Sequence, residues 1–110
     1  GGNFPLWLTP DQVILLPISD KYQKYSEKVL ESLENSEIRA LVDNRSEKTG
    51  RKIRDAEVGK IPFMLIVGEK EALDGTVSVR KHGEGDIGTF TIEEFISLIK
   101  TEESKILKEF

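Results

Sequence analysis

Residues 13–18 read VILLPI, residues 38–43 read IRALVD and residues 63–67 read FMLIV. The first and third of these runs are almost entirely apolar, as is typical of buried strands in a parallel sheet, whereas the second predicts a strand with Ile38, Ala40 and Val42 on one face. Between the first two runs, apolar side chains recur at helical spacing, at Tyr22, Tyr25, Val29, Leu30 and Leu33. Strand and helix therefore alternate, which predicts an α/β fold with right-handed crossovers and a parallel core.

The remaining pattern predicts two more helices and an edge strand. Residues 49–59 form a short basic segment in which Ile53 and Ala56 are the apolar anchors of a helix. Residues 76–80 alternate between apolar and polar side chains, as a half-exposed strand does. Thr91 and Glu94 have the spacing of a capping box, so we expect the last helix to start there.

Length and composition exclude several classes of protein. The 110 residues suffice for one domain. With no cysteine and a single histidine, His82, the chain excludes disulfide scaffolds, thiolate zinc sites and thiol catalysis, and His82 is predicted to be an unpartnered surface residue. No stretch has the ~18 apolar residues of a membrane span and no leader pattern opens the chain, so we expect a cytoplasmic location and no membrane partner.

One domain is predicted for residues 4–110, after a cloning remnant or disordered arm at residues 1–3. Phe4 and Trp7 are expected to attach the N-terminal arm to the core. The formal net charge is −4, from 16 basic and 20 acidic side chains. An acidic chain does not coat nucleic acid indiscriminately, so any site for a polyanion must be local.

The local site is predicted in residues 44–61, NRSEKTGRKIRDAEVGKI. Six cations and three acids give this segment +3, which leaves −7 for the rest of the chain. It follows the second predicted strand, and ligands of open α/β sheets bind beyond such carboxyl ends. The alternative is a solvated helix face with ordinary ion pairs. The six cations are Arg45, Lys48, Arg51, Lys52, Arg54 and Lys60.

Nucleotide chemistry is not indicated. The sequence contains no G-x-x-x-x-G-K-[ST] string, and Gly83, Gly85 and Gly88 lack the strand-to-helix context of a dinucleotide fingerprint. Glu69 and Glu71 follow a buried strand, where a carboxylate could accept a hydrogen bond from a base amino group.

Three strings, FPLWLTPDQV, DNRSEKTGRKIRDAEVGKIPFMLIVGEKE and GTVSVRKHGEGDIG, closely resemble the C-terminal anticodon-binding domain of threonyl-tRNA synthetases. The likeness extends over residues 4–99. Related prolyl, histidyl and glycyl domains share only a general skeleton with this sequence. The resemblance implies a three-layer α/β/α fold with a five-stranded, mixed, mostly parallel sheet, three helices and a short fifth strand near residues 88–90.

The resemblance also implies partners and roles. The partners would be the threonine tRNA anticodon loop and a catalytic domain of the parent chain, but not DNA. The parent would be a homodimeric, ATP-dependent threonine-tRNA ligase using Mg and Zn in other domains, whereas this piece would be a monomer without catalytic site, metal or cofactor. Family positions and local charge together predict these RNA-binding residues: Arg45, Ser46, Glu47, Lys48, Arg51, Lys52, Arg54, Glu71 and Arg80.

The genetic code narrows the bases to be recognised. Threonine codons share their first two letters, so the anticodon has a fixed middle G and a fixed third U. Arg80 can donate twice to the O6 and N7 edge of G, and Glu71 can accept from its N1–H and amino group. Arg54 suits the neighbouring base or a phosphate. Two alternatives stay open: a prolyl or histidyl anticodon-binding domain, and a small doubly wound domain for a metabolite or protein.

Overall fold

The computed structural model describes residues 12–108. Its centre is a five-stranded sheet in the order β2-β1-β3-β4-β5. The strands are β1 (Val13–Pro17), β2 (Ala40–Val42), β3 (Phe63–Val67), β4 (Thr76–Lys81) and β5 (Gly85–Thr91). β1 pairs in parallel with β2 and β3, whereas β3–β4 and β4–β5 are antiparallel. The predicted mixed α/β sheet is confirmed, with parallel and antiparallel pairings equal in number.

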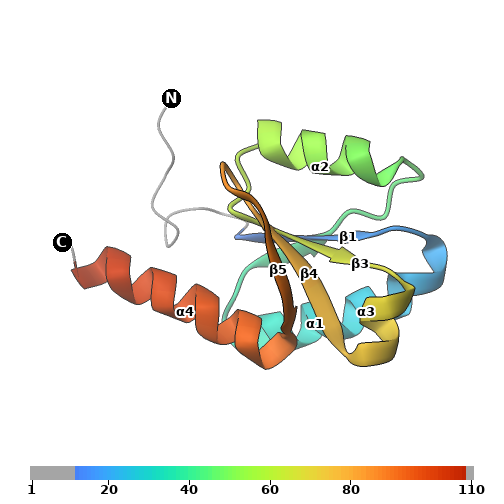
Figure 1. Ribbon diagram of the computed structural model, residues 1–110. Coiled ribbons are helices and arrows are strands. Elements are labelled where there is room, and N and C mark those ends of the chain that lie inside the picture. The colour runs from blue at the N-terminus through green and yellow to red at the C-terminus, as the bar shows by residue number, and fades with distance from the viewer. Residues whose placement is uncertain (1–11, 109–110) are drawn as a thin grey trace.

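Helices cover both faces of the sheet. They are α1 (Gln23–Asn35), α2 (Thr49–Val58), α3 (Glu69–Asp74) and α4 (Ile92–Lys108), and a 3-10 turn (Asp20–Tyr22) precedes α1. Figure 1 shows α2 alone on one face and α1, α3 and α4 on the other. The described residues thus hold four α-helices where three were predicted. α3 escaped prediction because its six residues are too few to display a helical period.

Two apolar clusters lie on the two faces. The larger one, between the sheet and the α1–α4 layer, has twelve buried members, and its Phe63 and Phe95 rings meet edge to face at 5.5 Å. The smaller one lies under α2 and consists of Ile14, Leu16, Ala56 and Met64. β1 supplies side chains to both clusters, as its continuous apolar pattern predicts.

The C-terminal half contains the predicted capping box and a fifth strand that is longer than predicted. Thr91 N donates to Glu94 Oε1 at 2.8 Å, and Glu94 N donates to Thr91 Oγ1 at 3.2 Å, so the capping box is present. β5 begins three residues before the predicted short strand. Gly83 and Gly85 have φ of 81°, a conformation that turns the chain tightly and lets pairing start at once.

β1 ends where the predicted apolar run leaves the sheet. Pro17 closes β1, as expected for a residue that cannot donate to the ladder. Ile18 leaves the sheet and is 50% exposed, although the apolar run includes it. The predicted contact of Phe4 and Trp7 with the core lies outside the described residues.

Candidate nucleic-acid interface

An open hollow of about 440 Å³ lies beyond the carboxyl ends of β1 and β2. The turn after β1 forms one wall, and residues 44–48 between β2 and α2 form the other. Both chain segments reach this edge because β1 and β2 are parallel neighbours. The lining residues are Pro17, Ile18, Ser19, Asp20, Gln23, Asn44, Arg45, Ser46, Glu47, Lys48 and Lys52.

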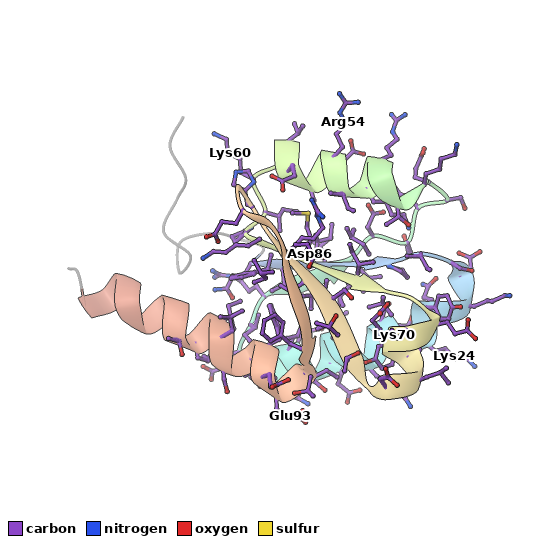
Figure 2. All side chains as sticks on the ribbon, in the orientation of Figure 1. Lys24, Arg54, Lys60, Lys70, Asp86 and Glu93 are labelled. Carbon is purple, nitrogen blue, oxygen red and sulfur yellow. The ribbon has the colours of Figure 1, made fainter. Side chains whose placement is uncertain are left out.

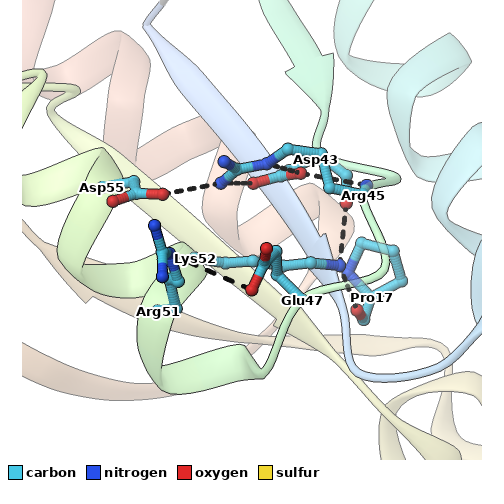
Figure 3. Close-up of polar contacts among 7 residues, drawn as sticks. All are labelled: Pro17, Asp43, Arg45, Glu47, Arg51, Lys52 and Asp55. Carbon is cyan, nitrogen blue, oxygen red and sulfur yellow. Dashed lines mark hydrogen bonds and ion pairs between the residues drawn. The ribbon is translucent and has the colours of Figure 1, made fainter.

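Arg45 is bound on two sides by carboxylates (Figure 3). Its Nε and Nη2 donate to the two Asp43 oxygens at 2.9 and 2.8 Å, and Nη2 also donates to Asp55 Oδ2 on α2 at 2.9 Å. The hydrogen bonds from the Arg45 side chain are the main cause that lowers the pKa of Asp43. The same contacts raise the pKa of Arg45 still further above its usual value. This guanidinium is therefore already neutralised by protein groups.

Lys52 is buried, with 4% of its surface exposed. Its Nζ donates to the backbone oxygen of Pro17, the last residue of β1, at 3.2 Å and to that of Asp43, the residue after β2, at 3.1 Å (Figure 3). The helical spacing places Lys52 on the inner side of α2, next to Ile53 and Ala56, so its long stem crosses the helix–sheet interface. The prediction that Lys52 contacts RNA stays a prediction; in this arrangement its ammonium donates to two backbone oxygens of the protein.

The other predicted residues of the segment are exposed. Ser46, Glu47 and Lys48 form the lip of the hollow. Arg51 has a loose contact with Glu47, at 3.9 Å, and remains 67% exposed. Arg54 projects from the outer side of α2, away from the sheet (Figure 2). The cations among these side chains, Lys48, Arg51 and Arg54, are accessible to an anionic ligand.

The structure does not bring Glu71 and Arg80 together. Arg80 pairs with Met64 near the start of β3, so it lies on the α2 face, where Met64 is buried. Glu71 follows the other end of β3, and its Oε1 accepts from Gly68 N at 2.8 Å. It lies in the α3 segment on the opposite side of the sheet from α2 (Figure 1). Joint recognition of one guanine would require one of these side chains to leave its position.

A sequence comparison identifies the family. The family described as "Anticodon binding domain" matches residues 12–102. The chain belongs to this family. It is 60% identical over 111 residues to a threonine–tRNA ligase of Flavobacterium johnsoniae and 57% identical over 109 residues to that of Bacteroides fragilis. Each match covers 99% of this chain and 17% of the relative, so the domain corresponds to a small part of those proteins.

Solved structures share the fold of this anticodon-binding domain. The RNA binding domain of threonyl-tRNA synthetase from Cryptosporidium parvum Iowa II has a TM-score of 0.85 and 28% identity, over 92% of this chain and 26% of that one. A prolyl-tRNA synthetase from Cryptosporidium parvum has a TM-score of 0.83 at 23% identity, over 96% of this chain and 23% of that one. The predicted resemblance to the threonyl synthetases is confirmed.

Sequence patterns missed several groups of the anticodon-binding domain that line the hollow, among them Ile18, Ser19 and Gln23. The rule that ligands bind beyond neighbouring carboxyl ends applies to β1 as well as β2 and could have identified them. His82 also differs from its prediction, because its Nδ1 lies 2.9 Å from Glu57 Oε2 of α2. Side chains from distant segments make this contact, so local patterns cannot show it.

The described residues 12–108 contain no cluster of three or more potential metal ligands. Within the same part of the anticodon-binding domain, no helix has both the length and the apolar character needed to cross a bilayer.

Proposed function

We propose that this domain recognises the anticodon of threonine tRNA for a threonine–tRNA ligase, through the middle G and the third U. The family match and the identity to curated threonine–tRNA ligases support this assignment. The single observation that carries it is the hollow beyond β1 and β2, with the exposed Lys48 at its lip and the exposed Arg51 on the adjoining helix, on a chain of net charge −4. Repulsion elsewhere favours one docking orientation for a polyanion.

The hollow suits an unpaired base. Bases of a tRNA loop can splay out of the stack, which exposes their hydrogen-bonding edges. The half-exposed Ile18 offers an apolar surface, while Ser46 and Glu47 offer polar atoms at the lip. Lys48 and Arg51 add positive charge for the adjoining phosphates. This combination fits a nucleotide better than an apolar metabolite.

Arg54 and Arg80 are proposed to act at separate places. Arg54, on the outer side of α2, would contact a neighbouring base or phosphate. Arg80 has no ion-pair partner among the described residues, and its Nε is shielded from solvent without a hydrogen-bond acceptor. We propose that Arg80 and Glu71 contact the anticodon independently of each other, because they lie on different sides of the sheet.

Catalysis is proposed to belong to the rest of the parent chain. That chain would be a cytoplasmic, homodimeric ligase that binds ATP, Mg and Zn in other domains. The present domain would bind tRNA as a monomer and hold none of these groups.

The test is a binding titration with anticodon stem-loops. We expect tighter binding to a loop with a threonine anticodon than to one changed at the middle base, by about 1–3 kcal/mol. Affinity should fall steeply with salt. The slope of log K against log salt is negative, and Lys48→Met should make it less steep by about 0.7, the value for one phosphate contact to a single strand. Lys28→Met is the matched control, because Lys28 is an exposed lysine on α1, outside the hollow.

Three results would contradict the proposal in different ways. Equal affinity for both loops would refute recognition of the middle base. A preference for a proline or histidine anticodon would assign the domain to another synthetase. An affinity that does not change with salt would favour a metabolite or protein ligand.

A further inference from the structure

We infer that Asp43, Arg45, Lys52 and Asp55 form a loop support, which sets the position of residues 44–48 for base discrimination and does not itself bind RNA. The inference deepens the proposed function and rests on it. It changes the role of Arg45 and Lys52 from direct RNA contacts to positioning residues. It also assigns a role to two acidic residues, Asp43 and Asp55.

Asp43 is the fixed point of the loop support. Its backbone N donates to Leu15 O at 2.9 Å, which attaches it to the middle of β1. The residue is 8% exposed, and Arg45 N donates to its Oδ1 at 3.2 Å. A carboxylate with a backbone donor and a guanidinium has little freedom to turn. The residue before the loop is therefore held by the sheet.

Arg45 connects this fixed point to α2. Its planar guanidinium donates twice to Asp43 and once to Asp55, which comes from a different element. Because the donors of a guanidinium have a fixed geometry, two carboxylates in contact with it also fix its plane. The chain that continues into Ser46, Glu47 and Lys48 thus leaves Arg45 in a defined direction.

Lys52 also connects α2 to the sheet. Its Nζ contacts the last carbonyl of β1 and the carbonyl of Asp43, so it ties α2 to both strand ends. The four charged groups are two cations and two anions and sum to zero. A phosphate therefore gains little from this cluster, whereas Arg51, exposed and loosely paired, offers a nearly free charge nearby.

Charge affects the affinity for every stem-loop in Asp55→Asn, whereas positioning affects the ratio of affinities between stem-loops. The substitution removes a negative charge from the RNA-binding edge, so by charge alone it should tighten binding to every stem-loop. It also removes the charged acceptor that ties Arg45 to α2. If the loop support sets base discrimination, the ratio of affinities for the matched and altered stem-loops should fall, by about fivefold to tenfold.

The experiment uses this chain and the two stem-loops described above, with wild type, Asp55→Asn, Asp55→Glu and Glu57→Gln. Glu57→Gln is the matched control, because it removes the same charge from the same helix and leaves the loop support intact. We expect it to keep the wild-type ratio. Asp55→Glu restores a carboxylate and should recover part of the ratio. Backbone 15N relaxation should show faster motion of residues 44–48 in Asp55→Asn only.

The outcomes separate the inference from the proposed function. A wild-type chain that binds both stem-loops equally contradicts the proposed function, and the inference falls with it. A discriminating wild type with an unchanged ratio in Asp55→Asn overturns the inference alone. A ratio that falls equally in Glu57→Gln also overturns it, because charge and not position would then be responsible. Unchanged relaxation of residues 44–48 in Asp55→Asn would likewise overturn it.

Discussion

The two faces of the sheet differ in what fills them. Among the residues whose burial the structure describes, the face toward α1 and α4 carries twelve buried apolar residues in one cluster. The face toward α2 carries four, and its edge contains the buried charges of Lys52 and Asp43. Apolar contacts are not directional, whereas each polar contact fixes an orientation. We therefore expect the face toward α1 and α4 to contribute more to the free energy of unfolding, and the face toward α2 to fix the geometry of the loop at residues 44–48.

The largest expected effect tests the apolar face. Phe95→Ala removes a fully buried ring that packs against Phe63, and we expect the free energy of unfolding to fall by about 3–5 kcal/mol. Urea unfolding followed by circular dichroism would measure it. If Phe95→Ala lowered the free energy of unfolding less than a substitution in the cluster under α2, the face toward α1 and α4 would not be the main source of stability.

A smaller effect is expected at the polar edge. Lys52→Met keeps the apolar stem but leaves the Pro17 and Asp43 carbonyls without their donor, and we expect a loss of about 1–3 kcal/mol in the free energy of unfolding. The salt dependence of RNA binding should stay unchanged, since the ammonium faces inward.

Lys48→Met is the comparison variant for Lys52. Lys48 is exposed, so the free energy of unfolding should change by less than about 0.5 kcal/mol, while the salt dependence should decrease. If Lys52→Met instead lowered the salt dependence without reducing stability, the prediction that Lys52 binds RNA directly would be supported over the positioning role.

One further effect concerns a single hydrogen bond of Tyr25, whose hydroxyl donates to Thr76 O at 2.7 Å. Burial, and secondly the charge of Glu71, raise the pKa of this phenol above its ordinary value of 10.0. The neutral phenol therefore stabilises the fold below pH 10.0, and this contribution is lost as the pH rises through the higher folded-state pKa. Tyr25→Phe should cost about 1 kcal/mol at neutral pH.

Unfolding measured between pH 8 and pH 12 would check this prediction, with Tyr22→Phe as the control. Stability of the wild type should decline at high pH more than that of Tyr25→Phe. An identical decline in both proteins would show that Tyr25 does not contribute to alkaline unfolding.

Elements with a repeated pattern could be predicted from sequence. The apolar runs identified β1 and β3, the period of Val29 and Leu33 identified α1, and the Thr91 capping box placed the start of α4. α3 could not be predicted because one and a half turns do not show a period. The family resemblance supplied the fifth strand, but its start at Gly85 depends on a tight turn.

The sequence predicted where the candidate site lies in the chain, but not which of its side chains are exposed and which are paired. Charge and strand order placed it in residues 44–61, where the hollow is found. However, six cations in a sequence look equivalent. Only contacts between segments show that Lys52 faces inward and Arg45 is paired with two carboxylates, whereas Arg54 faces outward.

The amino-acid sequence by itself determined the α/β class, the strand-and-helix order and the basic segment, because period and charge are local properties of a chain. The tertiary structure decided which cations are free, and it separated Glu71 from Arg80. The reason is geometric. An antiparallel return through β4 carries Arg80 back to the start of β3 and onto the α2 face, and no local spacing records where two distant segments meet.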